Sequence, residues 1–267
     1  MKIITLIENH VNSPGLVAEH GLSLYIDTGN KKILFDTGQS GLFIQNAQKL
    51  GIDIREIDLL VISHGHYDHT GGLYQFLEVN KKATVYAKKE IFTPKYSGKT
   101  RFIGTQPNEE ILADRFIFVQ TLTEVTPDVF IVPTIEIHHK IDTNFTNLYK
   151  KEGISFHTDI FDDELFIVIR KNDHINILTA CSHRGITNIC ETASTYFKLP
   201  VNLILGGFHM KDCGVEQYAH ITYYLQNLQP KLIGACHCTG VEKFAEMMGE
   251  YNSKLFYNFT GNEITIK

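Results

Sequence analysis

Four polar side chains of metal-binding type follow directly on a short apolar segment, and this feature most restricts the folds open to the chain. Residues 58–62 form an apolar run typical of a buried strand. The next residues, S-H-G-H-Y-D-H, supply His64, His66, Asp68 and His69. In α/β folds, ligand sites lie at the carboxyl edge of the sheet. The sequence therefore predicts an α/β fold with a site at such an edge.

The spacing of these four residues suits two metal ions. His64 and His66 are two apart in a turn and can bind one ion, while Asp68 and His69 stand near the start of the next helix and can reach a second. Imidazole and carboxylate donors favour zinc, iron or manganese over calcium. The alternative, a chance cluster of four such side chains after a core strand, explains the pattern much less well.

Three later segments repeat the order of a strand followed by a histidine. Residues 177–180 lead to His183, residues 203–205 to His209 and residues 232–235 to His237. Each of these histidines alone could be an ordinary core or loop residue. Their shared position at strand ends makes them further candidate ligands, in a chain with 13 histidines, the commonest metal-binding residue in proteins.

Composition and charge exclude several classes of protein. With 267 residues, of which 43% are hydrophobic and 21% charged, the chain can bury a large core as one α/β domain or two smaller ones. The net charge of −5 provides no general attraction to nucleic acid or to an anionic membrane. No apolar run approaches the roughly 20 residues that span a bilayer. We therefore expect a small-molecule substrate, with the oligomeric state left open.

The cysteines and the first residues bear on the compartment. Five cysteines form no spacing typical of a secreted disulfide framework. The first apolar run turns polar at Glu8, too early for the core of a signal peptide. A reduced, cytoplasmic environment is the expectation.

Apolar periodicity and turn residues predict the order of the elements. Strands are expected at 2–8, 22–27, 32–36, 58–62, 83–87, 116–120, 129–132, 165–170, 175–179, 201–205, 231–235, 254–259 and 263–266, and helices at 40–50, 72–79, 186–197, 215–228 and 241–251. Residues from about 88 to 153 hold four of the seven prolines. We predict a single domain spanning 1–267, with this stretch as an irregular insertion.

Taken together, these motifs resemble the metallo-β-lactamase superfamily. The resemblance lies in H-x-H-x-D-H at 64–69, F-D-T-G at 35–38 and the order of the later histidines. Within it, H-G-L-S at 20–23, C-S-H-R-G-I-T-N at 181–188, G-G-F-H at 206–209 and H-C-T-G at 237–240 are similar to proteins labelled 7,8-dihydropterin-6-methyl-4-(ribofuranosyl)-aminobenzene-5′-phosphate synthase-like.

The resemblance implies a four-layer αβ/βα sandwich and two divalent ions, zinc first, with manganese or iron as alternatives. In it, His64, His66 and His183 would bind the first ion, and Asp68, His69 and His237 the second. Asp36 would lie beneath them and orient the ligands.

One position departs from the superfamily pattern. Between His183 and His237, relatives usually have an aspartate that bridges both ions, whereas this chain has Gly207-Phe208-His209. His209 is therefore expected to bind one ion, to contact the substrate, or to do neither. These alternatives stay open, with Asp68 and His209 as the candidate catalytic residues.

The preferred function is a metal-dependent hydrolase. A metal-bound hydroxide would attack a small, anionic, phosphate-bearing ester or phosphodiester. A pterin-pathway synthase-like enzyme is one alternative. A catalytically idle metal- or ligand-binding sensor on the same fold is another.

Three further patterns support expectations about charge and about the cysteines. Residues 81–101 hold seven basic side chains and one acidic, and are expected to be a solvated face, or else a rim that attracts phosphate. The acids at 159–164 are expected in a solvated turn. A cysteine-ligated metal is disfavoured, because Cys236 and Cys238 alternate with His237 and should point away from it on an extended backbone.

Overall fold

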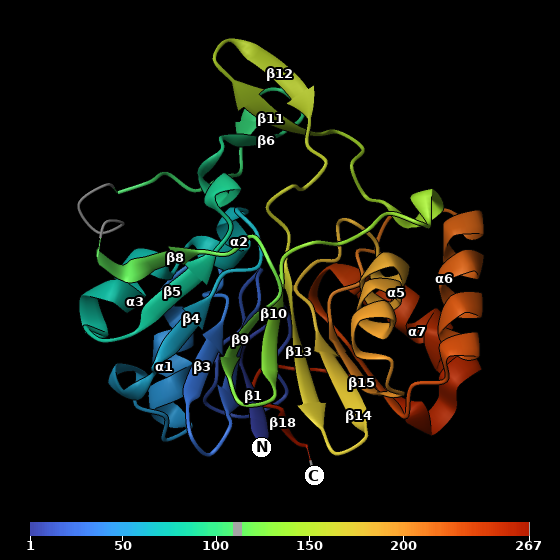
Figure 1. Cartoon of the computed structure of the whole chain (residues 1–267), viewed down its shortest axis with the longest axis horizontal. Helices are drawn as coiled ribbons and strands as arrows, with labels where there is room; N and C mark the ends of the chain where they lie inside the picture. The colour runs from blue at the N-terminus through green and yellow to red at the C-terminus, as the bar shows by residue number, and fades with distance from the viewer. Residues whose placement is uncertain (109–113, 267) are drawn as a thin grey trace. The chain divides into compact units, whose positions relative to one another are not determined.

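The computed structural model describes residues 1–108 and 114–266, which divide into two compact units. The first comprises Met1–Gln120, Phe145–Asp163 and Phe259–Lys267, and the second comprises Thr121–Asn144 and Glu164–Asn258. Each unit is built on its own mixed sheet with helices packed against it (Figure 1).

The sheet of the first unit has the strand order β18-β1-β2-β3-β4-β5-β8. Its strands are β1 (Lys2–Ile7), β2 (Ser23–Asp27), β3 (Lys32–Phe35), β4 (Leu59–Val61), β5 (Thr84–Ala87), β8 (Phe116–Phe118) and β18 (Glu263–Thr265). Its helices are α1 (Leu42–Lys49), α2 (Tyr67–Thr70) and α3 (Leu73–Val79), with short 3-10 turns η1 (Ile54–Glu56) and η2 (Lys89–Phe92). Strands β3, β4, β5 and β8 are parallel, so their carboxyl ends meet at one edge.

Strand β4 lies where the sequence predicts it because the core of this unit covers it on both faces. Leu34, Leu60 and Val85 stand in register on three adjacent parallel strands and are all buried. Phe43 of α1 and Phe76 of α3 belong to the same apolar cluster. A strand covered in this way must be apolar along its whole length, and the first polar side chains appear only where β4 ends.

The sheet of the second unit has the order β17-β16-β15-β14-β13-β10-β9. Its strands are β9 (Thr123–Thr126), β10 (Val129–Val132), β13 (Phe166–Lys171), β14 (His174–Leu178), β15 (Val201–Gly206), β16 (Leu232–Ala235) and β17 (Leu255–Tyr257). The helices are α5 (Ile186–Phe197), α6 (Val215–Leu228) and α7 (Val241–Tyr251), with the 3-10 turns η3 (Lys140–Asp142), η4 (His237–Thr239) and η5 (Asn252–Lys254). Strands β14 to β17 are parallel neighbours.

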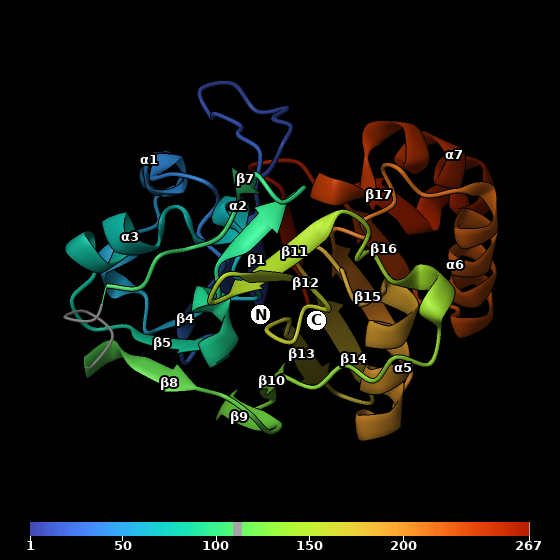
Figure 2. The same ribbon diagram turned by 90° about the horizontal axis from the view of Figure 1, so that it is seen from above.

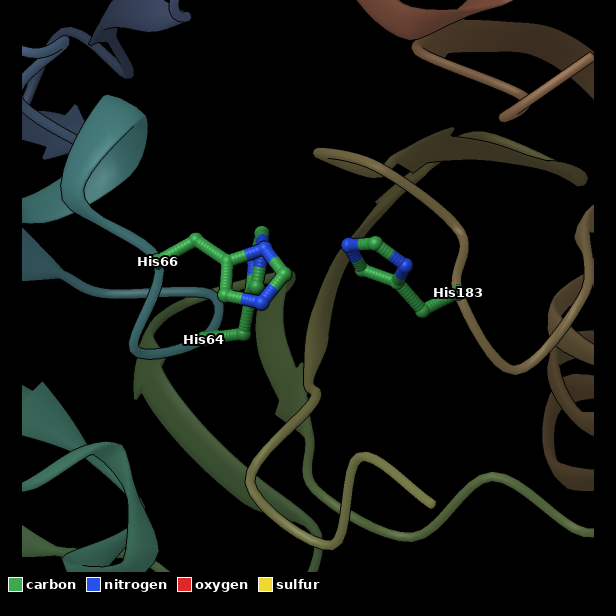
Figure 3. A group of neighbouring side chains, drawn as sticks. All are labelled: His64, His66 and His183. Atoms are coloured by element: carbon green, nitrogen blue, oxygen red, sulfur yellow. The ribbon is translucent and has the colours of Figure 1, made fainter. Parts of the chain in front are cut away.

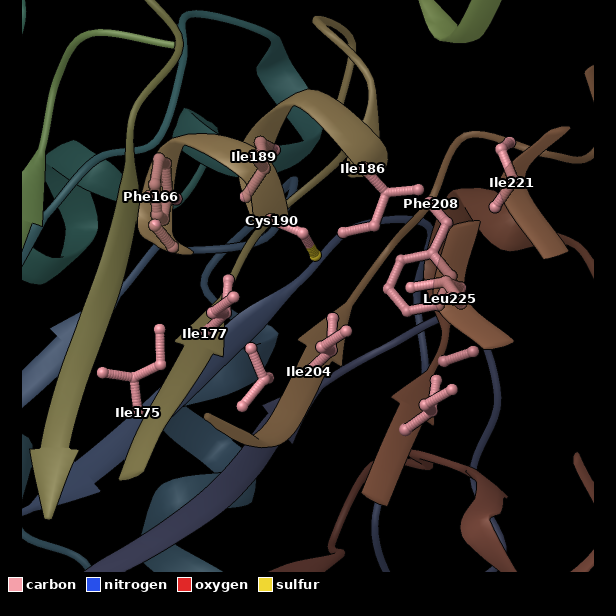
Figure 4. Close-up of a cluster of buried hydrophobic side chains, with 14 of the residues drawn as sticks. Phe166, Ile175, Ile177, Ile186, Ile189, Cys190, Ile204, Phe208, Ile221 and Leu225 are labelled. Atoms are coloured by element: carbon pink, nitrogen blue, oxygen red, sulfur yellow. The ribbon is translucent and has the colours of Figure 1, made fainter. Parts of the chain in front are cut away.

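Apolar side chains from this sheet and its helices form one core. Ile177 and Ile204 of the parallel strands pack with Ile189 of α5 and with Ile221 and Leu225 of α6 (Figure 4). All five are completely buried. Strands β14, β15 and β16 are parallel, so the loops that follow them all begin at the same edge of a well-packed sheet.

A third sheet takes three of its four strands from the stretch between about 88 and 153. Strands β6 (Lys95–Ser97), β7 (Arg101–Phe102), β11 (Leu148–Glu152) and β12 (Ser155–Thr158) form an antiparallel ribbon within the first unit, and Figure 2 shows β11 and β12 side by side. The Tyr96 ring packs on Phe102 and Phe156, with centroids 5.5 and 5.1 Å apart. Strands this short carry too few residues for periodicity to reveal them. Residues 109–113 of the predicted insertion lie outside the described residues.

The other predicted elements agree with the structure apart from their ends. Helices 186–197, 215–228 and 241–251 have the predicted bounds. In the part of the chain that the structure describes, no helix has both the length and the apolar character needed to cross a membrane.

Candidate metal centre

The loop between β4 and α2 carries two of the predicted ligands on neighbouring rings. The ring centroids of His64 and His66 lie 4.8 Å apart, and Figure 3 shows both side chains leaving this loop. His69, one turn further on in α2, has its ring 4.4 Å from that of His64. All three are buried, as is Asp68. The first unit by itself therefore gathers four of the predicted metal-binding side chains.

Asp36 ties this group together from the end of β3. Its backbone has a positive φ of 61°, and its carboxylate accepts hydrogen bonds from the Ser63 backbone N–H at 2.7 Å and the Ser63 hydroxyl at 2.6 Å. The same carboxylate lies 2.8 Å from Nδ1 of His69. Asp36 thus contacts His69 directly and reaches His64 through Ser63.

These contacts determine which nitrogen of each ring carries the proton. The single hydroxyl proton of Ser63 is donated to Asp36, so the Ser63 oxygen can only accept from Nδ1 of His64, at 2.9 Å. Nδ1 of His69 likewise donates to the carboxylate of Asp36. In both rings the Nε2 lone pair is then available to a metal, the tautomer that this kind of support selects.

Burial keeps the His64 ring neutral. Its pKa is lowered well below the usual value, first by burial and then by the neighbouring rings of His69 and His66. A metal binds the neutral imidazole, so this environment favours ligation over protonation.

A buried ion pair holds the histidine loop from the other side. Gly65, between the two histidines, donates its N–H to Asp163 at 2.7 Å. Asp163 also pairs with the Lys95 ammonium group at 3.0 Å, and Asp159 pairs with it at 2.6 Å. Burial alone would lower the pKa of Lys95. The carboxylates of Asp163 and Asp159 outweigh this effect and raise the pKa above its usual value, so the ammonium group stays charged. A β-carbon on Gly65 would overlap the Ile91 carbonyl, so the loop requires glycine there.

This ion pair corrects two expectations from the sequence. Lys95 is 2% exposed, so it belongs neither to a solvated basic face nor to a rim open to phosphate. Asp159, Asp163 and Glu164 are buried rather than part of a solvated turn. The charges escape solvent because they neutralise one another or accept backbone hydrogen bonds, which sequence order alone does not reveal.

His20 lies beside the candidate ligand Asp68, although the sequence pattern did not predict it there. Its Nε2 lies 3.1 Å from Oδ2 of Asp68, and its ring is about half exposed. The only signal was the H-G-L-S segment, whose histidine follows no predicted strand.

The other three candidate histidines lie in the second unit. His183 follows β14, and its backbone N–H donates to Glu164 at 2.7 Å; Figure 3 shows its side chain on that loop. The ring of His209, after β15, lies 4.4 Å from that of His183. His237 begins η4 after β16.

The expectation that both nearby cysteines point away from His237 is wrong for Cys238. The sulfur atoms of Cys181 and Cys238 and a ring nitrogen of His237 all lie within 4.8 Å of one another. The backbone is extended at Cys236 but turns into the 3-10 segment at His237, which has a positive φ of 52°. The alternation of side chains assumed for a strand therefore stops at His237.

The chemistry of these side chains fits divalent transition ions. The first unit supplies imidazoles and a carboxylate, and the second supplies imidazoles and thiols. Zinc and iron each accept all three donor types, whereas manganese prefers oxygen donors.

Both the fold and these side chains are of the kind found in metal-dependent enzymes. Similarity to known proteins identifies the family. Residues 17–161 match the metallo-beta-lactamase superfamily, and the chain belongs to that superfamily. The predicted resemblance and α/β fold class are confirmed.

Relatives cover nearly the whole chain. The 7,8-dihydropterin-6-methyl-4-(beta-D-ribofuranosyl)-aminobenzene-5′-phosphate synthase of Methanocaldococcus jannaschii is 31% identical over 94% of this chain and 92% of its own length. The solved structure of Tm1679, described as a metal-dependent hydrolase of the beta-lactamase superfamily, is 30% identical with a TM-score of 0.89, covering 100% and 99% of the two chains. A diphosphatase from the PhnP family has a TM-score of 0.56 at 15% identity over 98% and 96%, a likeness of fold alone.

Proposed function

We propose that this protein is a metal-dependent hydrolase acting on a small, phosphate-bearing ester or phosphodiester. Membership of the superfamily and the likeness to Tm1679 support the reaction class. The observation that carries the proposal is the contact of Asp36 with His69, together with its link through Ser63 to His64. A buried carboxylate that sets the tautomer of two imidazoles serves metal binding directly.

We assign the ions to the residues that the resemblance implies. His64, His66 and His183 would hold one, and Asp68, His69 and His237 the other. When bound, divalent ions lower the pKa of water toward about 7 and stabilise developing negative charge. Zinc is the first choice, because it accepts every donor type present.

The protein's own side chains would orient the reactants. Asp68 would accept the hydrogen bond that orients the attacking water. His20, 3.1 Å from Asp68 Oδ2, would keep that carboxylate in position. His209 would donate to the substrate as negative charge develops on it.

Arg101 supports an anionic substrate. Its guanidinium group is exposed and donates to the Tyr67 hydroxyl at 3.1 Å. Tyr67 stands between His66 and Asp68 in the chain, so this cation lies beside the metal-binding loop of its own unit. A fixed positive charge at that place attracts phosphate.

A second candidate function is a pterin-pathway synthase reaction. The observation in its favour is the 31% identity to the Methanocaldococcus jannaschii protein over 94% of the chain. That protein's name contains a 5′-phosphate, which agrees with the phosphate-bearing substrate of the first proposal.

A substrate panel tests the proposal. The purified protein, loaded with Zn²⁺ or Mn²⁺, is assayed on phosphodiesters, phosphomonoesters, lactones and thioesters. We expect metal-dependent turnover, fastest on a phosphorylated member. No turnover of any member despite bound metal would contradict a hydrolase and favour the synthase or a sensor.

Arg101→Gln tests the choice of substrate. It should raise KM for the phosphorylated substrate while leaving KM for a neutral lactone unchanged. Lys99→Gln is the matched control, because the Lys99 ammonium group lies over the Tyr149 ring, 5.1 Å from its centroid, rather than beside Tyr67. An equal effect of both variants would remove Arg101 from substrate binding.

A further inference from the structure

We propose that Cys181 and Cys238 are thiolate ligands of a zinc-type ion held at His237. This inference rests on the proposed function for the presence of an ion at His237, and it adds two ligands that the histidine and carboxylate set does not contain. The three residues that it concerns, Cys181, His237 and Cys238, all belong to the second unit.

The three candidate ligand atoms lie close together. The two sulfurs and a His237 ring nitrogen are within 4.8 Å of one another. Zinc bonds of about 2.3 Å to sulfur and 2.0–2.1 Å to nitrogen place the ligand atoms of a tetrahedral site roughly 3.5–3.8 Å apart. Small side-chain rotations would therefore close the group around an ion.

The sheet brings these residues together from distant parts of the chain. Cys181 follows β14, and His237 and Cys238 follow β16, with β15 lying between the two strands. The Gly207 N–H donates to the Ala180 carbonyl at 2.8 Å, and the Cys236 N–H donates to the Gly206 carbonyl at 3.1 Å. These bonds hold the ends of all three strands together beneath the thiols.

Gly207 makes the room that the Cys238 thiol occupies. A β-carbon at Gly207 would lie 2.5 Å from the Cys238 sulfur and 2.5 Å from the Ala180 carbonyl oxygen. Real β-carbons do not approach other atoms so closely, so any larger residue would expel the sulfur. The glycine and the 3-10 turn at His237 are independent features that place the same thiol.

Two cysteines of the same unit, Cys190 and Cys213, lie outside this group. The Cys238 sulfur donates to the Cys181 carbonyl at 3.3 Å, a proton that metal binding would release. Cys190 is enclosed in the apolar core, and burial raises its pKa. Burial also raises the pKa of the half-buried Cys213. Cys213 is therefore a matched control within the same unit.

Thiolate ligands would set the choice of metal. Sulfur favours zinc and other soft ions over manganese and magnesium. Each thiolate would also add negative charge in a chain that has His209 where the superfamily usually has an aspartate.

Cobalt spectroscopy tests the inference independently of activity. The full-length apoprotein is loaded with Co²⁺, and the near-ultraviolet thiolate-to-cobalt charge-transfer band is recorded. We expect the band in the wild type, a weaker band in Cys181→Ser and Cys238→Ser, and an unchanged band in Cys213→Ser. Zinc affinity, measured by chelator competition, should fall about tenfold or more in the first two variants only.

Alkylation of the unmutated protein avoids any dependence on how the variants fold. Zn²⁺ should protect Cys181 and Cys238 from iodoacetamide but leave the reactivity of Cys213 unchanged, as read by peptide mass. Bound Co²⁺ without the band, equal alkylation with and without zinc, or a Cys181–Cys238 disulfide in the metal-loaded protein would each overturn the inference.

The outcomes also separate this inference from the hydrolase proposal. Bound Co²⁺ without the band, accompanied by turnover, would leave the hydrolase proposal standing. The band without turnover would support the ligands and contradict the hydrolase.

Discussion

Asp163 accepts a hydrogen bond from the backbone N–H of Gly65 at 2.7 Å, and Gly65 is the residue that separates His64 from His66. The other oxygen of this carboxylate pairs with Lys95 of β6 at 3.0 Å. The Phe161 ring, two residues before Asp163, lies 5.2 Å from the His66 ring. The ribbon is thereby connected to the histidine loop through buried, charged contacts, which are strong where solvent is excluded.

Asp163→Ala should weaken metal binding, whereas Asp159→Ala should not. Each variant leaves Lys95 with one carboxylate, so each should lower the free energy of unfolding by roughly 1–3 kcal/mol. Only Asp163 contacts the histidine loop, and Asp159 instead accepts from the Phe161 N–H. We expect zinc affinity to fall about tenfold in Asp163→Ala alone, measured by chelator competition beside urea unfolding. Equal affinities in the two variants would show that the carboxylate only stabilises the fold.

His66→Ala should remove hydrolase activity while unfolding stays cooperative. His66 would supply a bond to metal, whereas the cores of the two units are apolar and do not include it. We expect activity below about a tenth of wild type at saturating zinc, with His157→Ala, an exposed histidine of β12, as the control. Full activity with metal still bound would rule out His66 as a ligand.

His209→Ala should keep its metal and lose turnover. His209 belongs to none of the groups of three clustered ligand atoms among the described residues, which favours contact with substrate over ligation. We expect unchanged metal content by elemental analysis and a kcat lower by roughly 10²-fold, as for a lost transition-state hydrogen bond. His209→Asp should not rescue kcat. A loss of one metal in His209→Ala, restored in His209→Asp, would instead identify a ligand.

Because of Asp142, the free energy of unfolding should fall as the pH rises from about 4 to 7. Burial raises its pKa to about 7, against the hydrogen bonds that its carboxylate accepts from Thr187. In that interval the folded state holds a proton that the unfolded chain has lost, so deprotonation favours unfolding. The effect should reach a few kcal/mol, because each pKa unit is worth about 1.4 kcal/mol.

Asp142→Asn isolates this contribution. The variant should gain stability relative to wild type as the pH rises from 5 to 8, measured by urea unfolding at both values. Asp173→Asn, in an exposed turn, provides the comparison. A difference between Asp142→Asn and wild type that stays constant with pH would refute the raised pKa.

Local pattern alone predicted the elements and the main motif. Apolar runs such as 59–61 must be buried on both faces, so they identify central strands without knowledge of their neighbours. The helices at 186–197 and 215–228 were found because a period near 3.6 persists over several turns. The H-x-H-x-D-H segment was found because its ligands are adjacent in the chain.

Tertiary structure alone decided which charges and thiols meet. Gly65 and Asp163 are 98 residues apart, and Cys181 and Cys238 are 57 apart. Nothing in the periodicity of a segment encodes such a pairing. Lys95 shows the physical reason, because a basic residue is expected in solvent unless two carboxylates are brought to it by folding. The sequence determined the strands that end in histidines, and the folding within each unit decided which side chains support them.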